Sequence, residues 1–273
     1  MIEQASGLPA LFGLVFALGM RHGFDPDHLA TIDSMARASA SRRPPHDARW
    51  ARWTGCLFSL GHGTVVTLVA AVIGMYSMQW DVPTWLESFG AWISIVVLAL
   101  LGWTNVRAAL ATPAGQSVRA MGLKGRLFGR LTRSSHPGLV VLVGSLFAVS
   151  FDTMSQTAVF ALAASTSAGW TMAALLGLVF TAGMMATDGL NGWLVAGMVR
   201  RADGMALMSS RGISLVIGAA SLLVAVLGAL RQFFPVIDSL FEGQSTWMGL
   251  MLFALVCCGY AVVARLARRS AAI

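Results

Sequence analysis

Long apolar segments alternate with short polar ones along most of the 273-residue chain. Each apolar segment is about 20 residues long or longer, which is the length of helix needed to cross the hydrocarbon core of a bilayer. The pattern therefore predicts an all-α fold, a polytopic membrane helix bundle with about seven transmembrane helices. The expected spans are 8–35, 54–77, 86–107, 138–164, 169–199, 210–233 and 245–266.

The composition favours a membrane protein over a soluble one. Hydrophobic residues make up 56% of the chain and charged residues only 11%, against about 25% charged residues in an average soluble domain. The net charge of +7 could indicate a nucleic-acid partner, but the basic residues lie in short loops between the spans. We therefore expect a lipid bilayer, and no nucleic acid, as the partner of this chain.

The basic residues also predict the orientation in the membrane. Seventeen of the 19 Lys and Arg residues lie in loops 37–53 and 107–137, after the fifth span, or after the seventh. All these places fall on one side of a seven-span bundle, and cytoplasmic loops carry the excess of Lys and Arg. We expect a multi-pass protein of the cytoplasmic (inner) membrane, with its N-terminus outside and its C-terminus in the cytoplasm.

An ionisable cluster interrupts the first apolar segment. Residues 21–33 read RHGFDPDHLATID and place two imidazoles and three carboxylates within thirteen residues. Such groups are expensive inside a bilayer, so they indicate a functional site. Pro26 cannot donate a backbone hydrogen bond to the carbonyl of His22, so we expect the helix to kink or unwind there and to free carbonyl oxygen beside the imidazoles. Broken helices of this kind form ion sites in secondary transporters.

Other ionisable residues lie at the same depth as this cluster. At about 1.5 Å rise per residue, His62 in the second span, Asp152 in the fourth and Asp188 in the fifth all fall near the middle of the membrane. They are level with His22 and Asp25. Unpaired charge at this depth would be prohibitive without a bound cation. Imidazole and carboxylate without thiolate suit Ni²⁺, Co²⁺ or Zn²⁺ better than Ca²⁺ or Cu⁺.

Two pairs of short motifs indicate an internal repeat. Phe24-Asp25 in the first span is similar to Phe151-Asp152 in the fourth, and Gly61-His62-Gly63 in the second is similar to Thr187-Asp188-Gly189 in the fifth. Because three spans per unit is an odd number, the two units must be inserted in opposite orientations, as in alternating-access carriers. We expect one transporter domain over 1–273, made of repeat one (8–107), a cytoplasmic loop (108–137), repeat two (138–233) and an extra helix (245–266).

Four stretches together resemble the signatures of the nickel/cobalt transporter (NiCoT) family. RHGFDPDHLATID resembles the H-x4-D-H signature, with His22, Asp27 and His28 at its fixed positions. LFSLGHGTVV at 57–66, SFDTMSQ at 150–156 and FTAGMMATDGLNG at 180–192 look like the other three signatures. That family usually has eight spans with the H-x4-D-H signature in the second, so this chain looks like a divergent member without the usual first span.

The resemblance implies a permease that imports Ni²⁺ or Co²⁺ into the cytoplasm without an ATPase. It implies a transported ion in place of a cofactor, and no enzyme activity. The residues that match the motif positions, and that we expect to bind the metal, are His22, Asp25, Asp27, His28, His62, Asp152 and Asp188.

Four further residues are expected around these ligands. Gln156 and Asn191 are neutral where the family tends to have acidic residues, which leaves the preferred metal open. Arg21 is expected to neutralise a neighbouring carboxylate of the motif. Asp33 lies near the cytoplasmic end of its span and is expected to meet water or to pair with Arg37 at i+4.

Other functions compete with metal import. A metal exporter, or a carrier of Zn²⁺ or Mn²⁺, would use the same donors, and the driving force and the oligomeric state stay open. A haem protein could use His22 and His62 as facing ligands, but the surrounding carboxylates are unsuited to a haem face. Enzyme functions have less support, because the H-E-x-x-H motif of metalloproteases is absent and Ser59 near His62 is a weak signal for a serine protease.

Overall fold

The computed structural model describes residues 2–40, 47–76, 84–112, 137–149, 169–205, 207–241 and 244–270. Every regular element within these residues is helical. In this described part of the chain, five helices are long and apolar enough to cross a membrane, and two shorter apolar helices, Leu8–Gly23 and Pro137–Phe147, accompany them. The elements are α1 (Ile2–Gly23), α2 (Pro26–Ala40), the 3₁₀ helix η1 (Asp47–Trp53), α3 (Thr54–Tyr76), α4 (Thr84–Ala111), α6 (Pro137–Phe147), α8 (Gly169–Met205), α9 (Leu207–Phe233), α10 (Pro235–Phe241) and α11 (Ser245–Ser270).

The predicted spans match these helices with two differences. The first expected span is divided, because helical geometry stops at Gly23 and resumes at Pro26. The fourth is represented by α6, which ends at Phe147, and residues 150–168 lie outside the described part of the chain. The remaining expected spans, 54–77, 86–107, 169–199, 210–233 and 245–266, are α3, α4, α8, α9 and α11. The polytopic all-α fold is therefore confirmed.

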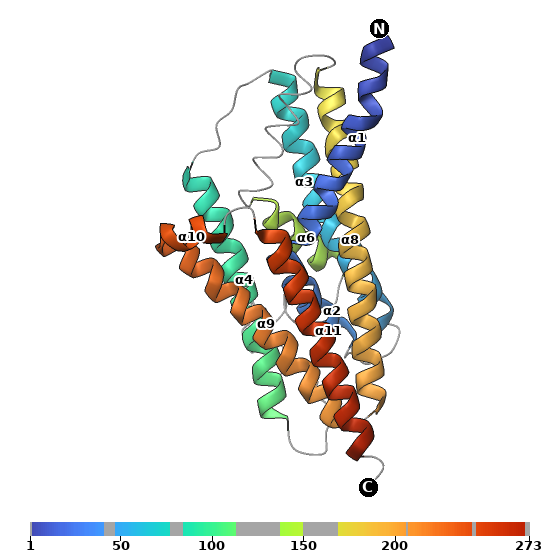
Figure 1. Cartoon of the computed structure of the whole chain (residues 1–273), viewed down its shortest axis with the longest axis vertical. Coiled ribbons are helices and arrows are strands. Elements are labelled where there is room, and N and C mark those ends of the chain that lie inside the picture. The colour runs from blue at the N-terminus through green and yellow to red at the C-terminus, as the bar shows by residue number, and fades with distance from the viewer. Residues whose placement is uncertain are drawn as a thin grey trace.

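The long helices form two antiparallel pairs. α3 lies along α8 with opposite direction, because Gly55 packs against Asp188 near one end and Gly74 packs against Trp170 near the other. α4 lies along α9 in the same antiparallel manner, because Gly228 of α9 packs against Ile95 and Gly218 packs against Val106. In Figure 1, α8 runs along most of the molecule, α1 and α3 extend toward the end where the chain begins, and α4, α9 and α11 extend toward the end where it finishes.

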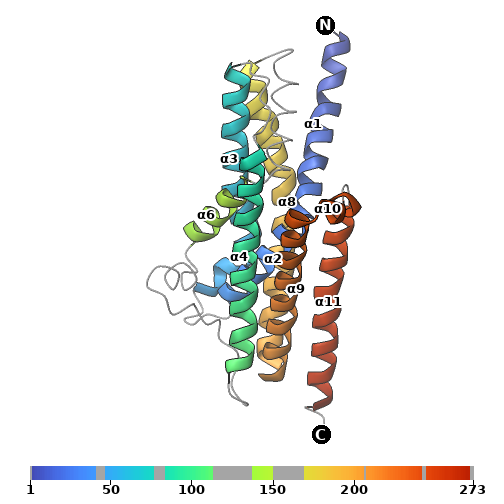
Figure 2. The ribbon, with the colours of Figure 1, turned by 90° about the vertical axis from the view of Figure 1, so that its left-hand side faces the viewer.

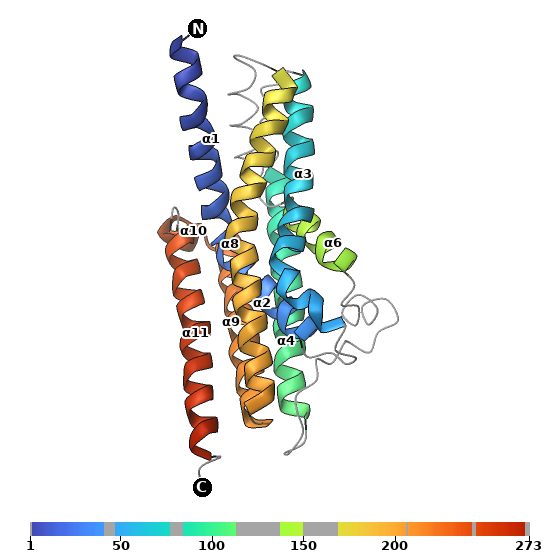
Figure 3. The ribbon, with the colours of Figure 1, turned by 90° about the vertical axis from the view of Figure 1, so that its right-hand side faces the viewer.

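The short helices lie near the middle of the long axis. Figure 2 shows α2 behind α4 and close to α9, and Figure 3 shows α6 on the outer side of α3. α2 packs against α8, α9 and α11. Its buried apolar side chains form two parts of the core: Leu29 packs with residues of α9 and α11, whereas Ile32 packs with Phe58 of α3 and Phe147 of α6.

Glycines bring α1 and α8 into close contact. A methyl group on Gly19 of α1 would overlap the carbonyl oxygen of Phe180 on α8, and one on Gly183 of α8 would overlap the carbonyl oxygen of Phe16 on α1. Small residues are the usual means by which membrane helices approach this closely. The crossing is reciprocal, since each helix presents its glycine to the backbone of the other.

A second reciprocal crossing joins α3 and α6. A methyl group on Gly61 of α3 would overlap the carbonyl oxygen of Val141, and one on Gly144 of α6 would overlap the carbonyl oxygen of Phe58. Two residues beyond Gly61, Gly63 faces Thr181 of α8 with no room for a methyl group. α3 is therefore held between α6 and α8 at the residue between these glycines, His62.

We expect Gly61→Ala to destabilise the fold, because the methyl group meets backbone atoms of Val141 that cannot rotate away. Overpacking of this kind costs about 1–3 kcal/mol, which should lower the thermal midpoint of the detergent-solubilised protein. Gly197→Ala in α8 is the matched control, because nothing lies within 4 Å of a methyl group there. That control should be neutral or stabilising, since alanine is favoured over glycine in helices by roughly 0.5–1 kcal/mol. Equal midpoints for the two variants would contradict the tight crossing.

Candidate metal centre

The break between α1 and α2 presents two histidines to the interior. His22 lies at the end of α1, and His28 lies in the first turn of α2. Pro26 occupies the first position of α2, where its missing N–H is not needed, and the carbonyl oxygen of Asp25 accepts the N–H of Leu29 at 3.1 Å. The predicted interruption at Pro26 is therefore present, and it separates the two imidazoles onto two short helical ends.

One expected feature of this break is wrong. The carbonyl oxygen of His22 was expected to be freed, but it accepts the backbone N–H of Asp25 at 3.0 Å. The carbonyl oxygen of Arg21 likewise accepts the N–H of Phe24 at 3.0 Å. These three-residue turns replace the lost helical bonds, so the chain breaks without leaving this carbonyl open for a cation.

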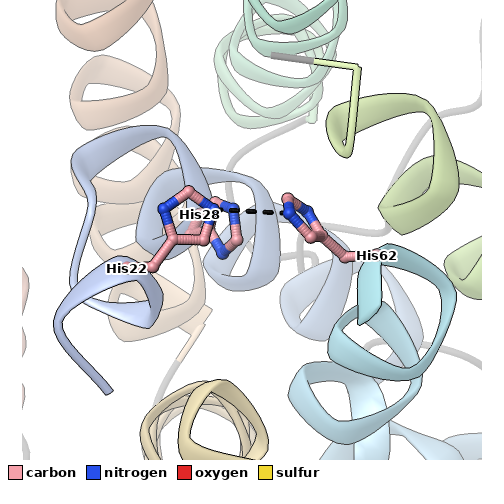
Figure 4. A group of neighbouring side chains, drawn as sticks. All are labelled: His22, His28 and His62. Carbon is pink, nitrogen blue, oxygen red and sulfur yellow. Dashed lines mark hydrogen bonds between the residues drawn. The ribbon is translucent and has the colours of Figure 1, made fainter. Parts of the chain in front are cut away.

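Three buried imidazoles meet at the break. His22 (3% exposed) and His28 (1%) face His62 (0%), which comes from α3 (Figure 4). Their ring centroids are 4.6 to 5.1 Å apart, and Nε2 of His22 lies 3.3 Å from Nε2 of His62. One nitrogen from each ring lies within 4.8 Å of the others. Nitrogens that share one ion at about 2.1 Å are at most about 4.2 Å apart, so small side-chain rotations would complete a three-nitrogen site.

Two carboxylates lie beside the Nδ1 atoms of two of the imidazoles. Oδ2 of Asp25 lies 2.9 Å from Nδ1 of His22, and Oδ2 of Asp188 lies 3.4 Å from Nδ1 of His28. A carboxylate on Nδ1 fixes the ring and leaves Nε2 available to a metal, as carboxylates do behind ligating histidines in metalloproteins. Oδ1 of Asp188 has no hydrogen-bond partner within the described residues. Asp25 and Asp188 therefore lie next to the histidines and can orient their rings. Oδ1 of Asp188 is a further oxygen that could bind an ion.

Ser59 positions the Asp188 carboxylate. Its hydroxyl is buried and donates to Oδ2 of Asp188 at 2.7 Å, while it also lies 3.0 Å from the carbonyl oxygen of Gly55. Sequence reasoning considered Ser59 only as a possible nucleophile and missed this role. Its position three residues before His62, on the same face of one helix, was the signal that could have found it.

Aromatic rings enclose the imidazoles. Phe58 and Phe147 stand edge to face with His28, at centroid distances of 4.9 and 6.4 Å, and Phe180 lies 5.5 Å from His22. All three phenyl rings are fully buried. These residues could not be predicted from the sequence, because apolar aromatic residues are common in membrane spans. The rings exclude water, so electrostatic interactions inside the cluster are stronger than at a surface.

Two further residues of the motif contact other partners. Oδ1 of Asp27 accepts the backbone N–H of His28 at 3.0 Å, in the first turn of α2, where a negative charge is favourable. Arg21 was expected to neutralise a motif carboxylate, but it is exposed and its Nε donates to Oγ1 of Thr246 at 3.2 Å. Metal ligation by Asp27 stays a prediction, and the structure gives Arg21 a contact with α11 instead.

Asp33 is buried at 3% exposure, whereas water was one of its two expected environments. Its Oδ1 accepts the side-chain N–H of Asn191 at 3.0 Å. The neutral Asn191 therefore contacts a carboxylate directly. Asp152 and Gln156, expected as ligand and neighbour, lie outside the described residues.

The fold and this site define a class: a multi-pass helical membrane protein with a buried cluster of imidazoles and carboxylates that could hold a divalent transition metal. The sequence model of one family, described as High-affinity nickel-transport protein (NicO), matches residues 8–269. The chain therefore belongs to this family, which is a family of transporters and not of enzymes.

Several transport proteins are similar to the chain. Nickel transporter NixA of Staphylococcus aureus is 30% identical over 67% of this chain and 60% of its own length. Nickel transporter NicT of Mycobacterium tuberculosis is 27% identical over 90% of this chain and 75% of its own length. Cobalt transport protein NhlF of Rhodococcus rhodochrous is 30% identical over 67% and 58%. The chain thus spans from about three fifths to three quarters of these relatives, and no solved structure matches it.

We expect each of the variants His22→Ala, His28→Ala and His62→Ala to weaken Ni²⁺ binding by the detergent-solubilised protein by about tenfold or more, since even groups behind the ligands contribute that much. Because the three rings form one site, a double variant should lose little beyond the single variants. Equilibrium dialysis with metal analysis measures both effects. His136→Ala, in a predicted loop, is the control, and wild-type affinity in any two of the three variants would contradict a shared site.

Proposed function

We propose that this protein is a secondary transporter that imports a divalent transition-metal cation, Ni²⁺ or Co²⁺, across the cytoplasmic membrane. The observation that carries the proposal is the buried meeting of three imidazoles within 4.8 Å, backed by two carboxylates. The family and the names of its similar members support nickel or cobalt as the substrate. Imidazole donors suit these ions, and a buried site that excludes water suits a carried ion that must lose its hydration shell.

We further propose that two inverted repeats, 8–107 and 138–233, provide alternating access. In this repeat, α1 of the first span corresponds to α6 of the fourth, and α3 of the second corresponds to α8 of the fifth. The α1–α8 crossing should therefore have its counterpart in the α3–α6 crossing. Both crossings are reciprocal. In each of the four helices, the carbonyl that contacts the partner helix's glycine belongs to the residue three positions before that helix's own glycine. The four matching segments are Phe16-x-x-Gly19, Val141-x-x-Gly144, Phe58-x-x-Gly61 and Phe180-x-x-Gly183.

The third and sixth spans add a crossing that is symmetric by itself. A methyl group on Gly102 of α4 would lie 2.9 Å from the carbonyl oxygen of Gly218 on α9, and one on Gly218 would lie 3.0 Å from the carbonyl oxygen of Gly102. Because α4 and α9 are antiparallel, this reciprocity is what an inverted pair requires. These contacts support the repeat in a register that aligns Phe58-x-x-Gly61 with Phe180-x-x-Gly183, which differs from the alignment of His62 with Asp188 expected from the motifs. The loop 108–137 joins the repeats, and 245–266 in α11 stands outside them.

The proposed direction, import, comes from the resemblance to the family, and the orientation of the chain is proposed separately. The described chain begins and ends at opposite ends of the long axis (Figure 1), which supports an outside N-terminus together with the basic residues of the loops. α2 then leads from the imidazoles toward the cytoplasm. The haem alternative has little support, because the Nε2 atoms of His22 and His62 are already in contact at 3.3 Å and the ring of His28 lies beside both.

We expect purified protein in proteoliposomes to accumulate Ni²⁺ or Co²⁺ under an inside-negative potential, and His22→Ala to reduce uptake to the level of empty vesicles. The variant removes one of the imidazoles that replace the hydration of the ion. Radiometal counting, with Zn²⁺ and Mn²⁺ compared under imposed potentials and pH gradients, measures rate, preference and driving force together. His46→Ala, in a predicted loop, controls for loss of one histidine, and wild-type uptake by His22→Ala would refute the site.

A further inference from the structure

A second polar contact joins α2 and α8 beyond the imidazoles. The first contact is between His28 and Asp188 at 3.4 Å, and the second is between Asp33 and Asn191 at 3.0 Å. Asp33 follows His28 by five residues, about 7.5 Å along the helix. Asn191 follows Asp188 by three residues, about 4.5 Å along α8. Both contacts therefore lie on one interface, and the second is displaced toward the C-terminal ends of both helices.

The Asp33 and Asn191 side chains are built like a site for a cation. Both are 3% exposed, and a buried carboxylate is costly unless its oxygens have partners. Oδ1 of Asn191 has no hydrogen-bond partner within the described residues, while its Nδ2 donates to Asp33. An amide carries a donor and an acceptor on one rotatable group. Rotation of this amide would turn Oδ1 toward the carboxylate and give two oxygen ligands to an ion held there.

The geometry points to Asp33 and Asn191 as a second, weaker binding station for the transported divalent cation on its way from the imidazoles to the cytoplasm; this inference rests on the proposed function. Oxygen donors hold Ni²⁺ and Co²⁺ less tightly than imidazole does. An ion that leaves three nitrogens for two oxygens therefore moves to a site from which it is released more easily. When no ion is present, the amide N–H takes its place against the carboxylate.

The charge beyond this station is consistent with a release step. Arg37 is buried one helical turn after Asp33, and its Nε donates to Oγ of Ser214 on α9 at 3.3 Å. A fixed positive charge there would prevent a cation from resting farther along α2. The ion is therefore expected to stay at Asp33 only briefly before it leaves.

The test compares binding with transport in the full-length protein. We expect Asp33→Asn to leave the Ni²⁺ affinity of the solubilised protein within about twofold of wild type, as for sites that do not share a ligand. Its Ni²⁺ uptake into proteoliposomes should fall by about tenfold or more in maximal rate, with little change in the apparent KM. A loss of binding equal to the loss of uptake would overturn the inference, because Asp33 would then belong to the imidazole site. Wild-type uptake by Asp33→Asn would overturn it as well.

The second variant exchanges the two side chains of the pair, Asp33 and Asn191. Asp33→Asn combined with Asn191→Asp restores one carboxylate and one amide at the same place, so we expect it to recover most of the uptake lost by Asp33→Asn. Failure to recover would overturn the station, since a role of Asp33 that depends on other neighbours would not be restored. Ser34→Ala is the matched control, because it removes another buried polar contact of α2, to Ser221 at 2.8 Å, without a carboxylate.

The same experiment separates this inference from the function on which it rests. If wild-type protein accumulates neither Ni²⁺ nor Co²⁺, the proposed function fails. If wild type accumulates the ion and His62→Ala loses both binding and uptake, the function stands, and the behaviour of the Asp33 variants then decides the station alone.

Discussion

The structure depends on one missing hydrogen-bond donor, the backbone nitrogen of Pro26. In an uninterrupted helix, His22 and His28 would lie about 9 Å apart along the axis and about 120° apart around it, so they could not face one partner. The break lets α1 end at Gly23 and α2 begin at Pro26, and the two rings then approach to a centroid distance of 4.6 Å. Only with this geometry can His62 of α3 contact both of them.

The break and the depth of the imidazoles were predictable from the sequence, whereas contacts that depend on how the helices rotate against one another were not. The break follows from one residue, and the meeting of His62 with the motif follows from helix length and depth, so sequence reasoning found both. The closure of the His22 carbonyl by Asp25 depends on how the chain turns, and the contact between Asp33 and Asn191 depends on how α2 rotates against α8. Hydropathy and spacing contain no information about such rotations. The spacing of Ser59 from His62 places it on the same helix face, but its contact with Asp188, 129 residues away, could not be predicted from that spacing.

The contact between two of the imidazoles also bears on how they could bind an ion. The contact between the Nε2 atoms of His22 and His62 requires that one of them carries a proton. A metal needs the lone pairs of both atoms, so binding must move that proton to the Nδ1 side or release it. Oδ2 of Asp25 lies 2.9 Å from Nδ1 of His22, on the opposite side of the ring from Nε2. A proton carried by either Nε2 atom would occupy a position that the proposed ion needs, within a site enclosed by Phe58, Phe147 and Phe180.

The proposed repeat makes the helical framework symmetric and leaves the chemistry asymmetric. With the register given by the glycine crossings, the position of His22 in α1 corresponds to Phe147 in α6, and that of His62 in α3 corresponds to Met184 in α8. Both counterparts are fully buried apolar residues. Repeat one therefore supplies the imidazoles, and the second repeat contributes Asp188 and the enclosing apolar side chains. A symmetric framework can exchange two conformations of similar energy, while an asymmetric ligand set places one imidazole site between them, and both properties suit the proposed alternating-access carrier.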